Sequence, residues 1–399
     1  MSRWEQPRSR RFGSSLAAIV GAAVVAVLVA TVVPERGEPA GRLEISSDPS
    51  TEAPLTVQDT RWRRPRPGTW RRLPIAPLTS RGGPALVWTG TEVIVWGGFD
   101  SHGRPLTDGG AFDPATGTWR RLVEHDAHDA IAQGVWTGAE AVFVSARETF
   151  RYDPTRRRWH AAPTLPVPVG HALTDRVFAV GWSVVAVTEP FVRDGSSAVF
   201  GLDPGADRWQ RLPDVPARLT SEHVMLPAGS TLLVFGRATD TDDVDDASGD
   251  GLRLDLRDDD AGWQRVAGPP ALSGRRLRRL VGAAVGDQIV LWGASGDGRP
   301  NYATAFDGAR WRRLDPGPIA TTWAVDALWI GDGLIVWDRL ANDGAILDPT
   351  RDRWTPLPAP PLPAALPRPT VWTGASLFTW GAFGTGGAMY TPECCAPAP

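Results

Sequence analysis

The chain has 399 residues, including 43 Gly, 37 Pro and 19 Trp, and its formal net charge is −3. This charge balance argues against nucleic acid and other strong polyanions as partners. The length exceeds that of a usual single domain, but a repeat protein that buries its core between units reaches it readily.

The N-terminus predicts a membrane anchor. Residues 1–13 carry four Arg and one Glu, and residues 16–33 follow without a charge. A run of this length is close to the lower limit for crossing a hydrocarbon core of about 30 Å. Because the Arg residues precede the apolar run, we expect a cytoplasmic tail at 1–13, a transmembrane signal anchor at 14–33 and the remainder outside the cell. A cleaved signal peptide is the alternative.

Residues 34–67 are rich in Pro, Glu, Ser and Thr and predict a flexible linker. The chain then enters a unit that is clearest between Pro84 and Leu122. Its runs at 85–88 and 93–96 are rich in Val, Ile and Trp, as strands are, and turn residues lie between them. A third strand begins near Ala111 and a fourth carries Trp119, with an Asp-Pro turn between them.

This unit repeats along the chain. The fourth-strand Trp recurs with a mean period of about 47 residues, at Trp70, Trp119, Trp159, Trp209, Trp263, Trp311 and Trp354. The phrase Val-Trp-Thr-Gly of the first hairpin occurs at 87–90, 135–138 and 371–374. Four short strands at this period are typical of a β-propeller, in which each blade buries both faces against its neighbours.

The repeated residues resemble the kelch family, whose unit has a glycine pair after the second strand and a later Trp. The resemblance covers roughly residues 68–391, although only one second strand is followed by an intact glycine pair, Gly97-Gly98. It implies an all-β fold similar to the central domain of galactose oxidase. Counting units predicts a seven-bladed propeller of four-stranded blades, in which the N-terminal strand at 68–73 completes the last blade. Residues 392–399 form a C-terminal tail.

The long loops of such blades share one face, where binding residues are expected. The densest group there is the run His125, Asp126, His128 and Asp129, which offers imidazole and carboxylate ligands to a divalent metal. A solvated loop is the alternative reading of these four residues. No other cofactor is predicted.

Further ligand-binding candidates lie at or just after the end of a second strand, or just before the first strand of a blade. They are Asp100, His102, Arg104, Asp108, Trp323 and Trp380. The two Trp side chains offer stacking surfaces to sugar rings, whereas aromatic packing between blades is the alternative.

The sequence favours a non-catalytic role. Galactose oxidase has Tyr and His copper ligands and a Cys-Tyr cross-link, but the two cysteines here, Cys394 and Cys395, are at the C-terminus. Phosphate-binding and nucleophile motifs do not occur either. We therefore expect a single-pass cell-membrane protein whose extracytoplasmic propeller binds a protein or a glycan. A carbohydrate-active or metal-dependent enzyme with its site on the same face is the alternative.

Overall fold

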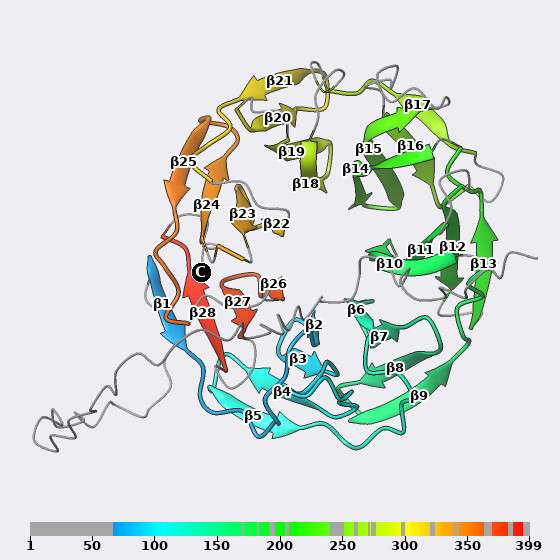
Figure 1. The fold of residues 1–399 in the computed structure, drawn as a ribbon, viewed down its shortest axis with the longest axis vertical. Coiled ribbons are helices and arrows are strands. Elements are labelled where there is room, and N and C mark those ends of the chain that lie inside the picture. Colours follow the sequence, from blue (N-terminus) through cyan, green and yellow to red (C-terminus); the bar gives the residue numbers. More distant parts are fainter. Residues whose placement is uncertain are drawn as a thin grey trace, which may run out of the picture. The chain divides into compact units, whose positions relative to one another are not determined.

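The computed structural model describes residues 67–393, apart from residues 169–170, 182, 191–195, 204–206, 217, 240–250, 259–261, 270–271, 273–276, 297–299, 320–323, 339, 342, 363–368 and 382–385. Within this part, antiparallel strands form seven four-stranded sheets arranged in a ring (Figure 1). The predicted seven-bladed propeller with four-stranded blades is therefore confirmed. The predicted cytoplasmic tail, membrane anchor and almost all of the linker lie outside the described residues. No helix in the described part is long and apolar enough to span a membrane.

The blades follow one another along the chain, and we number them I to VII. Blade I contains β2 (Ala85–Trp88), β3 (Val93–Trp96), β4 (Gly109–Asp113) and β5 (Thr118–Arg121). Blade II contains β6 (Gln133–Trp136), β7 (Ala141–Val144), β8 (Thr149–Asp153) and β9 (Arg158–Ala162). Blade III contains β10 (His171–Val180), β11 (Ser183–Pro190), β12 (Ala198–Asp203) and β13 (Arg208–Leu212). Blade IV contains β14 (Arg218–Ala228), β15 (Thr231–Thr239), β16 (Gly251–Asp255) and β17 (Gln264–Val266).

The remaining blades have the same order of strands. Blade V contains β18 (Leu277–Val285), β19 (Gln288–Ser295), β20 (Tyr302–Phe306) and β21 (Trp311–Leu314). Blade VI contains β22 (Val325–Trp329), β23 (Leu334–Asp338), β24 (Asp343–Asp348) and β25 (Arg353–Pro356). Blade VII contains β26 (Thr370–Trp372), β27 (Leu377–Trp380), β28 (Gly387–Thr391) and, as its outermost strand, β1 (Thr69–Arg72).

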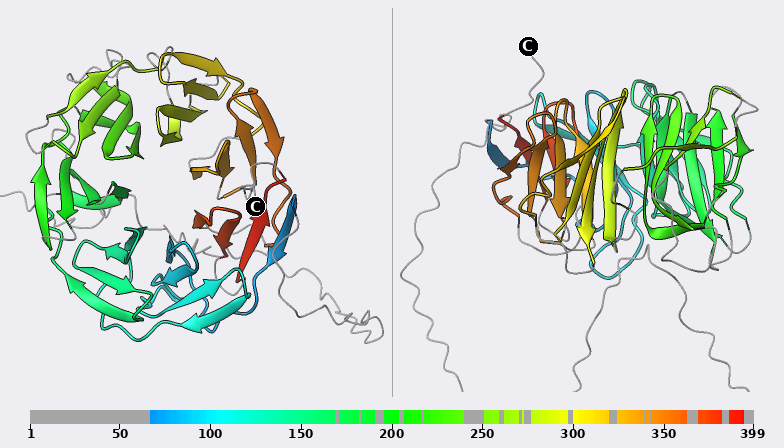
Figure 2. Two further views of the ribbon diagram at one scale, coloured as in Figure 1. Left: turned by 180° about the vertical axis from the view of Figure 1, so that it is seen from behind. Right: turned by 90° about the horizontal axis from the view of Figure 1, so that it is seen from above.

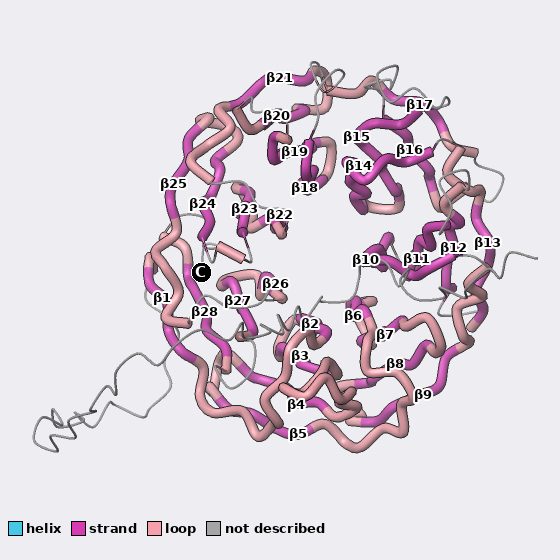
Figure 3. The backbone as a smooth tube through the Cα atoms, in the orientation of Figure 1, coloured by secondary structure: helices cyan, strands magenta, loops and turns pink. Residues whose placement is uncertain are grey.

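The strands run between the two flat faces of the ring, as the side view in Figure 2 shows. The first strand of each blade lies innermost and the fourth outermost (Figure 3). Because neighbouring strands are antiparallel, the loops that join them lie alternately at the two faces. We call the face with the second-to-third-strand loops and the connectors between blades the loop face. The opposite face, with the hairpin turns inside each blade, is the tight-turn face.

The hydrophobic core lies between the blades. In the described residues it consists of seven clusters, one at each junction of neighbouring blades. Trp119 packs at the junction of blades VII and I, while Leu122 packs at the junction of blades I and II. Trp119 in β5 and Leu122 directly after that strand therefore point to opposite faces of the sheet, as their odd spacing predicts.

The repeated Trp, which lies in the fourth strand of six blades and directly before it in blade IV, connects each blade to the one before it. In every blade its indole Nε1–H donates a hydrogen bond to a backbone carbonyl just beyond the fourth strand of the preceding blade. The seven bonds, all between 2.6 and 3.1 Å, are Trp70 to Pro358, Trp119 to Pro74, Trp159 to Val123, Trp209 to Pro163, Trp263 to Pro213, Trp311 to Ala267 and Trp354 to Asp315. The period read from the sequence is thus the period of an inter-blade contact.

The ring closes between the two ends of the domain. β1 pairs antiparallel with β28, with Thr69 opposite Thr391 and Arg72 opposite Ala388. The indole of Trp70 lies 5.2 Å from the ring of Tyr390 and 5.7 Å from that of Trp337, measured between centroids. Blade VII therefore combines strands from both ends of the domain, and this pairing covers the edge that β28 would otherwise expose.

Blades III, IV and V differ from the other four at the loop face. Their first strands have 10, 11 and 9 residues, whereas those of blades I, II, VI and VII have 4, 4, 5 and 3. Each long hairpin contains a β-bulge, between Leu173 and Val177, between Leu219 and His223, and between Leu277 and Arg279. Bulges are frequent beside functional sites because they redirect a side chain.

Candidate functional site

The predicted loop residues of blade I order their own loop. The Asp100 carboxylate accepts hydrogen bonds from the backbone N–H of His102 at 2.8 Å and of Arg104 at 2.9 Å, and from the Arg104 Nε at 2.6 Å. The backbone N–H of Arg104, followed by its guanidinium, holds the pKa of Asp100 below its usual value. The side chains of His102 and Arg104 are each 75% exposed. The ligand-binding role predicted for these residues thus stays a prediction.

Asp108 has a partner that the sequence analysis did not single out. Arg81 is completely buried, and its guanidinium donates to the Asp108 carboxylate at 2.7 Å and to the carbonyls of Asp108, Gly97 and Thr79. The carbonyl of Arg81 in turn accepts a hydrogen bond from the Trp380 indole at 3.3 Å. Arg81 therefore connects the blade VII–I connector to the loop of blade I, and Asp108 serves this structural contact.

The two predicted Trp positions differ in what the structure describes. Trp380 is 4% exposed and packs edge-on against Trp119, with 5.6 Å between the ring centroids. Its ring is therefore part of the junction between blades VII and I. Trp323 lies outside the described residues.

The predicted metal ligands of the blade I–II connector have separate surroundings. The His125 ring stacks on Trp159 with 4.8 Å between centroids and lies 4.7 Å from Phe150, and burial lowers the pKa of its imidazole. His128 is 80% exposed and its Nδ1 lies 3.6 Å from the Glu148 carboxylate. The other Glu148 oxygen accepts the backbone N–H of His128 and of Asp129, and Asp126 is exposed. The proposed metal binding of these four residues remains a prediction.

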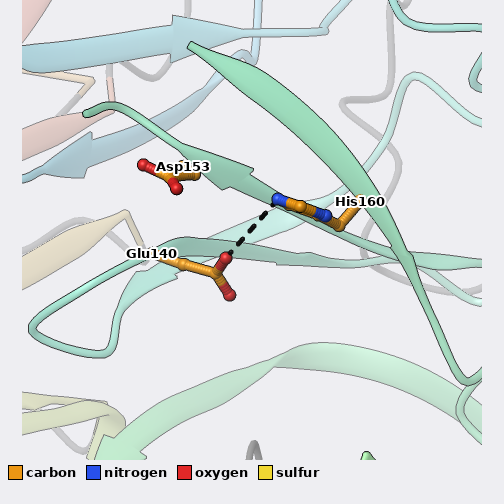
Figure 4. A group of neighbouring side chains, drawn as sticks. All are labelled: Glu140, Asp153 and His160. Carbon is orange, nitrogen blue, oxygen red and sulfur yellow. Dashed lines mark ion pairs between the residues drawn. The ribbon is translucent and has the colours of Figure 1, made fainter. Parts of the chain in front are cut away.

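A different His and carboxylate group does gather, on the tight-turn face of blade II. Ligand atoms of Glu140, Asp153 and His160 all lie within 4.8 Å of one another (Figure 4). The His160 Nε2 is 3.8 Å from Glu140, but Arg151 also approaches Glu140 at 3.7 Å, and the Arg156 guanidinium donates to Asp153 at 2.9 Å. A divalent metal could bind here, although two guanidinium groups already neutralise the carboxylates.

The equivalent position in blade I has an arginine instead of a histidine. Arg120 occupies the position of His160, directly after the repeated Trp, and its Nε donates to Glu92 at 2.9 Å. Its other end donates to the Tyr152 hydroxyl of blade II at 2.9 Å. The corresponding site is thus an ion pair in blade I, which favours the Arg151 ion pair as the role of Glu140 in blade II as well.

A third polar group lies on the loop face between blades III and IV, where the bulged hairpins are. Glu189 near the end of β11 has its Oε1 2.9 Å from Arg176 NH1, and Arg176 lies within the bulge of β10. The same oxygen lies 3.7 Å from the Nε2 of His223, the first residue after the bulge of β14. The side chains of Arg176, Glu189 and His223 are 18%, 31% and 2% exposed. We call these three residues the III–IV cluster.

His171 extends this group of polar residues along the same hairpin. Its Nδ1 lies 3.3 Å from the hydroxyl of the buried Thr188, which precedes Glu189. None of these residues was predicted as a site. The available signal was the loss of strict alternation between His171 and Val177, which indicates a bulge.

Comparison with known proteins supports the fold. No family model matches the chain, and no curated protein matches it. Among solved structures, the chain is similar to a novel fungal alcohol oxidase of the AA5 family in complex with copper. The TM-score is 0.56 at 13% sequence identity, with 83% of this chain and 78% of the other covered. The protein therefore has a propeller fold like that of the galactose-oxidase family, and at this identity the likeness extends to the fold alone.

The described residues do not fit a copper site with tyrosine ligands, because the three tyrosines of this chain pack against other side chains. The Tyr152 hydroxyl receives a hydrogen bond from Arg120, and the Tyr390 ring contacts Trp70. Tyr302 is 1% exposed and packs in the cluster between blades IV and V. The absence of a Cys-Tyr cross-linked copper site stays a prediction from the sequence, because Cys394 and Cys395 lie outside the described residues.

Proposed function

We propose that this protein is a non-catalytic binding propeller, held outside the cell by a membrane anchor at residues 14–33, and that the loop face of blades III–V receives a protein or glycan ligand. The observation that carries the proposal is the III–IV cluster. Arg176 and Glu189 of blade III and His223 of blade IV converge at two bulges, although their strands are far apart in sequence.

The asymmetry of the ring supports the same location. A propeller needs only short strands to bury its blade junctions, as blades I, II, VI and VII show. The extra length and the bulges of blades III–V add backbone that the junctions do not require. Irregular backbone held on a rigid scaffold is a common way to present binding residues.

Site-directed photo-cross-linking tests this proposal in the full chain, expressed in its native membrane. A benzophenone side chain replaces Ser196, which is exposed on the loop face of blade III, and in a control it replaces Arg208, exposed on the tight-turn face of the same blade. We expect a cross-linked protein or glycoconjugate from position 196 and none from position 208. Equal labelling from both faces, or none from position 196, contradicts the proposal.

An enzyme with a site on the same face is the second candidate, since the similar fungal structure is an alcohol oxidase in complex with copper. This candidate predicts stoichiometric metal in the purified chain and loss of that metal in the double variant His125→Ala, His128→Ala. Elemental analysis of both proteins decides it. Metal-free protein with no turnover of alcohols or sugars leaves the binding role as the better proposal.

A further inference from the structure

The tight-turn face of blade II contains two groups that face each other without a hydrogen bond. The Glu140 carboxylate lies 3.7 Å from Arg151 NH1 and 3.8 Å from His160 Nε2, and both contacts are longer than a hydrogen bond. The His160 Nε2 is buried, and no group in the described part of the chain forms a hydrogen bond with it. Since buried polar atoms are normally paired, the space between these two groups needs an occupant.

The equivalent groups of blade I are in direct contact. There the Arg120 guanidinium donates to both oxygens of Glu92, at 2.9 Å from its Nε. In blade II the shorter His160 stays 3.8 Å from the corresponding acid, Glu140. Two ligands of one tetrahedral zinc ion lie about 3.3–3.5 Å apart, given bonds of about 2.0–2.2 Å. The separation in blade II is therefore close to that of two ligands of a shared metal ion.

Asp153 supplies a third ligand. Ligand atoms of Glu140, Asp153 and His160 all lie within 4.8 Å of one another (Figure 4). They come from three neighbouring strands, since Glu140 directly precedes β7, Asp153 ends β8 and His160 lies in β9. Side-chain shifts of roughly 1 Å bring such a set to zinc-binding distances. Glu140 is 27% exposed and has no hydrogen bond to break, so it is free to make this shift.

The neighbouring guanidinium groups leave the carboxylates available. Arg151 also pairs with Asp207 of blade III, so it keeps a partner when Glu140 turns to a metal ion. The Arg156 side chain that pairs with Asp153 is 68% exposed, and exposed ion pairs are weak. In this network of ion pairs three carboxylates face two guanidinium groups. The excess negative charge favours a cation.

We propose that Glu140, Asp153 and His160 bind a zinc ion at the tight-turn face of blade II. One imidazole with two carboxylates suits zinc, whereas calcium and magnesium take oxygen ligands. The ion connects the ends of β7 and β8 to β9, and in the metal-free chain Glu140 pairs with Arg151 instead. The site is separate from the connector residues predicted as metal ligands, and it goes beyond the binding role proposed for the loop face.

Isothermal titration calorimetry with zinc chloride tests the proposal. The sample is the full chain without a histidine tag, freed of metal by a chelator. We expect one zinc ion per chain with a dissociation constant of about 10 μM or below, and binding of calcium chloride at least ~100-fold weaker. Absence of zinc binding at ~100 μM, or equal affinity for the two metals, overturns the inference.

Variants assign the bound zinc to its ligands. His160→Gln and Glu140→Gln should each weaken zinc binding by about tenfold or more, because loss of an outer-shell partner alone has an effect of this size. His102→Gln, which changes a 75% exposed histidine of the loop face, is the control and should bind zinc unchanged. The double variant His125→Ala, His128→Ala should also retain the ion. Loss of zinc in the double variant, or unchanged binding in both blade II variants, overturns the inference.

X-ray absorption at the zinc edge needs no variant and therefore decides the matter if a substitution unfolds the chain. We expect one imidazole in the coordination sphere and oxygen as every other ligand, at about 2.0–2.2 Å. Two imidazoles, or none, would exclude the assigned ligand set. The result is independent of cross-linking from position 196, so the zinc site and the loop-face binding role stand or fall separately.

Discussion

The outer and inner parts of the ring follow different rules. At the outer wall all seven blades are alike, since each fourth-strand Trp donates to a carbonyl of the preceding blade. At the inner loop edge the blades form two groups, with short first strands in I, II, VI and VII and long, bulged ones in III–V. Contacts that every blade needs are repeated, and the departures from the repeat are the basis for the binding site that we propose.

The largest expected effect on stability comes from removing β1, the outermost strand of blade VII. Deletion of residues 67–73 removes β1, exposes the edge of β28 and eliminates the Trp70–Pro358 hydrogen bond. We expect a chain that unfolds without a single cooperative transition and associates through the open edge. Thermal unfolding and size-exclusion chromatography measure both effects. Arg72→Gln, at an exposed position of the same strand, is the control, and a stable monomer after the deletion would contradict closure by β1.

The next largest expected loss of stability comes from Arg81, which connects blades VII and I at the loop face. Arg81→Met keeps the side-chain length but leaves Asp108 and the carbonyl of Gly97 without their buried donor. Asp108 is 38% exposed, so the main cost is that of the acceptors that lose their donor, about 1–3 kcal/mol for each buried group. Arg121→Met is the matched control, because Arg121 lies 3.9 Å from the same carboxylate but is 65% exposed. Chemical denaturation should show a loss several times larger for Arg81, and equal losses would refute the assigned role.

The repeated Trp allows a test of uniformity. Trp209→Ala should lower the free energy of unfolding by roughly 3–5 kcal/mol, as truncation of a buried aromatic side chain does. Trp209→Phe retains most of the packing and removes the bond to Pro163, so the expected loss is near the ~1 kcal/mol of a single hydrogen bond. Trp119→Phe in blade I should lose the same amount. A several-fold difference between the two Phe variants would show that the outer wall is less uniform than the geometry indicates.

The sequence predicted the repeated part of this molecule better than the exceptions. The Trp period, the Val-Trp-Thr-Gly hairpins and the unpaired strand around Trp70 were sufficient for the blade number and type. The buried role of Arg81 could not be read in the same way, because Ser80-Arg81-Gly82 has the composition of an exposed turn. Its burial depends on the carbonyls of Gly97 and Asp108, which only the folded loop brings together.

The III–IV cluster was missed for a related reason. Glu189 and His223 belong to different blades, and their approach depends on the register of two hairpins. Two bulges shift that register, and a shift by one residue reverses the face on which a side chain lies. Pattern analysis of single strands therefore finds residues of the right chemistry without showing that they face one another.

A smaller effect is expected from the turns between the third and fourth strands, which occur in both groups of blades and contain an Asp with a lowered pKa. The backbone N–H of Arg156 and then its guanidinium lower the pKa of Asp153 in blade II, and the backbone N–H groups of Arg310 and Ala309 lower that of Asp307 in blade V. In the unfolded chain an Asp has a pKa of about 3.9. The folded state therefore binds fewer protons, so these turns stabilise the fold above that pH and the stability is lost as the pH falls through the lowered values.

Thermal unfolding between neutral pH and about pH 3 measures this effect, since that range includes the ordinary Asp pKa. Asp153→Asn and Asp307→Asn keep an oxygen that can accept the backbone N–H bonds but do not titrate. Each variant should lose less of its stability on acidification than the unaltered chain does, and by a similar amount in the two blades. Asp126→Asn, at an exposed loop position, is the control; identical acid sensitivity in all four proteins would exclude a role for these turns.

The smallest expected change in stability is at the III–IV cluster, where the expected change in binding is large. Glu189 and Arg176 are 31% and 18% exposed, and a Gln at position 189 keeps an oxygen that can accept from Arg176, so the expected loss is near the ~1 kcal/mol of a single hydrogen bond. Glu189→Gln should therefore change the denaturation midpoint far less than Arg81→Met does, while it impairs ligand binding. A loss comparable to that of Trp209→Ala would mean that the extended hairpins need this pair for their packing. The long first strands of blades III and IV would then have a structural role, and their greater length would no longer support a binding site.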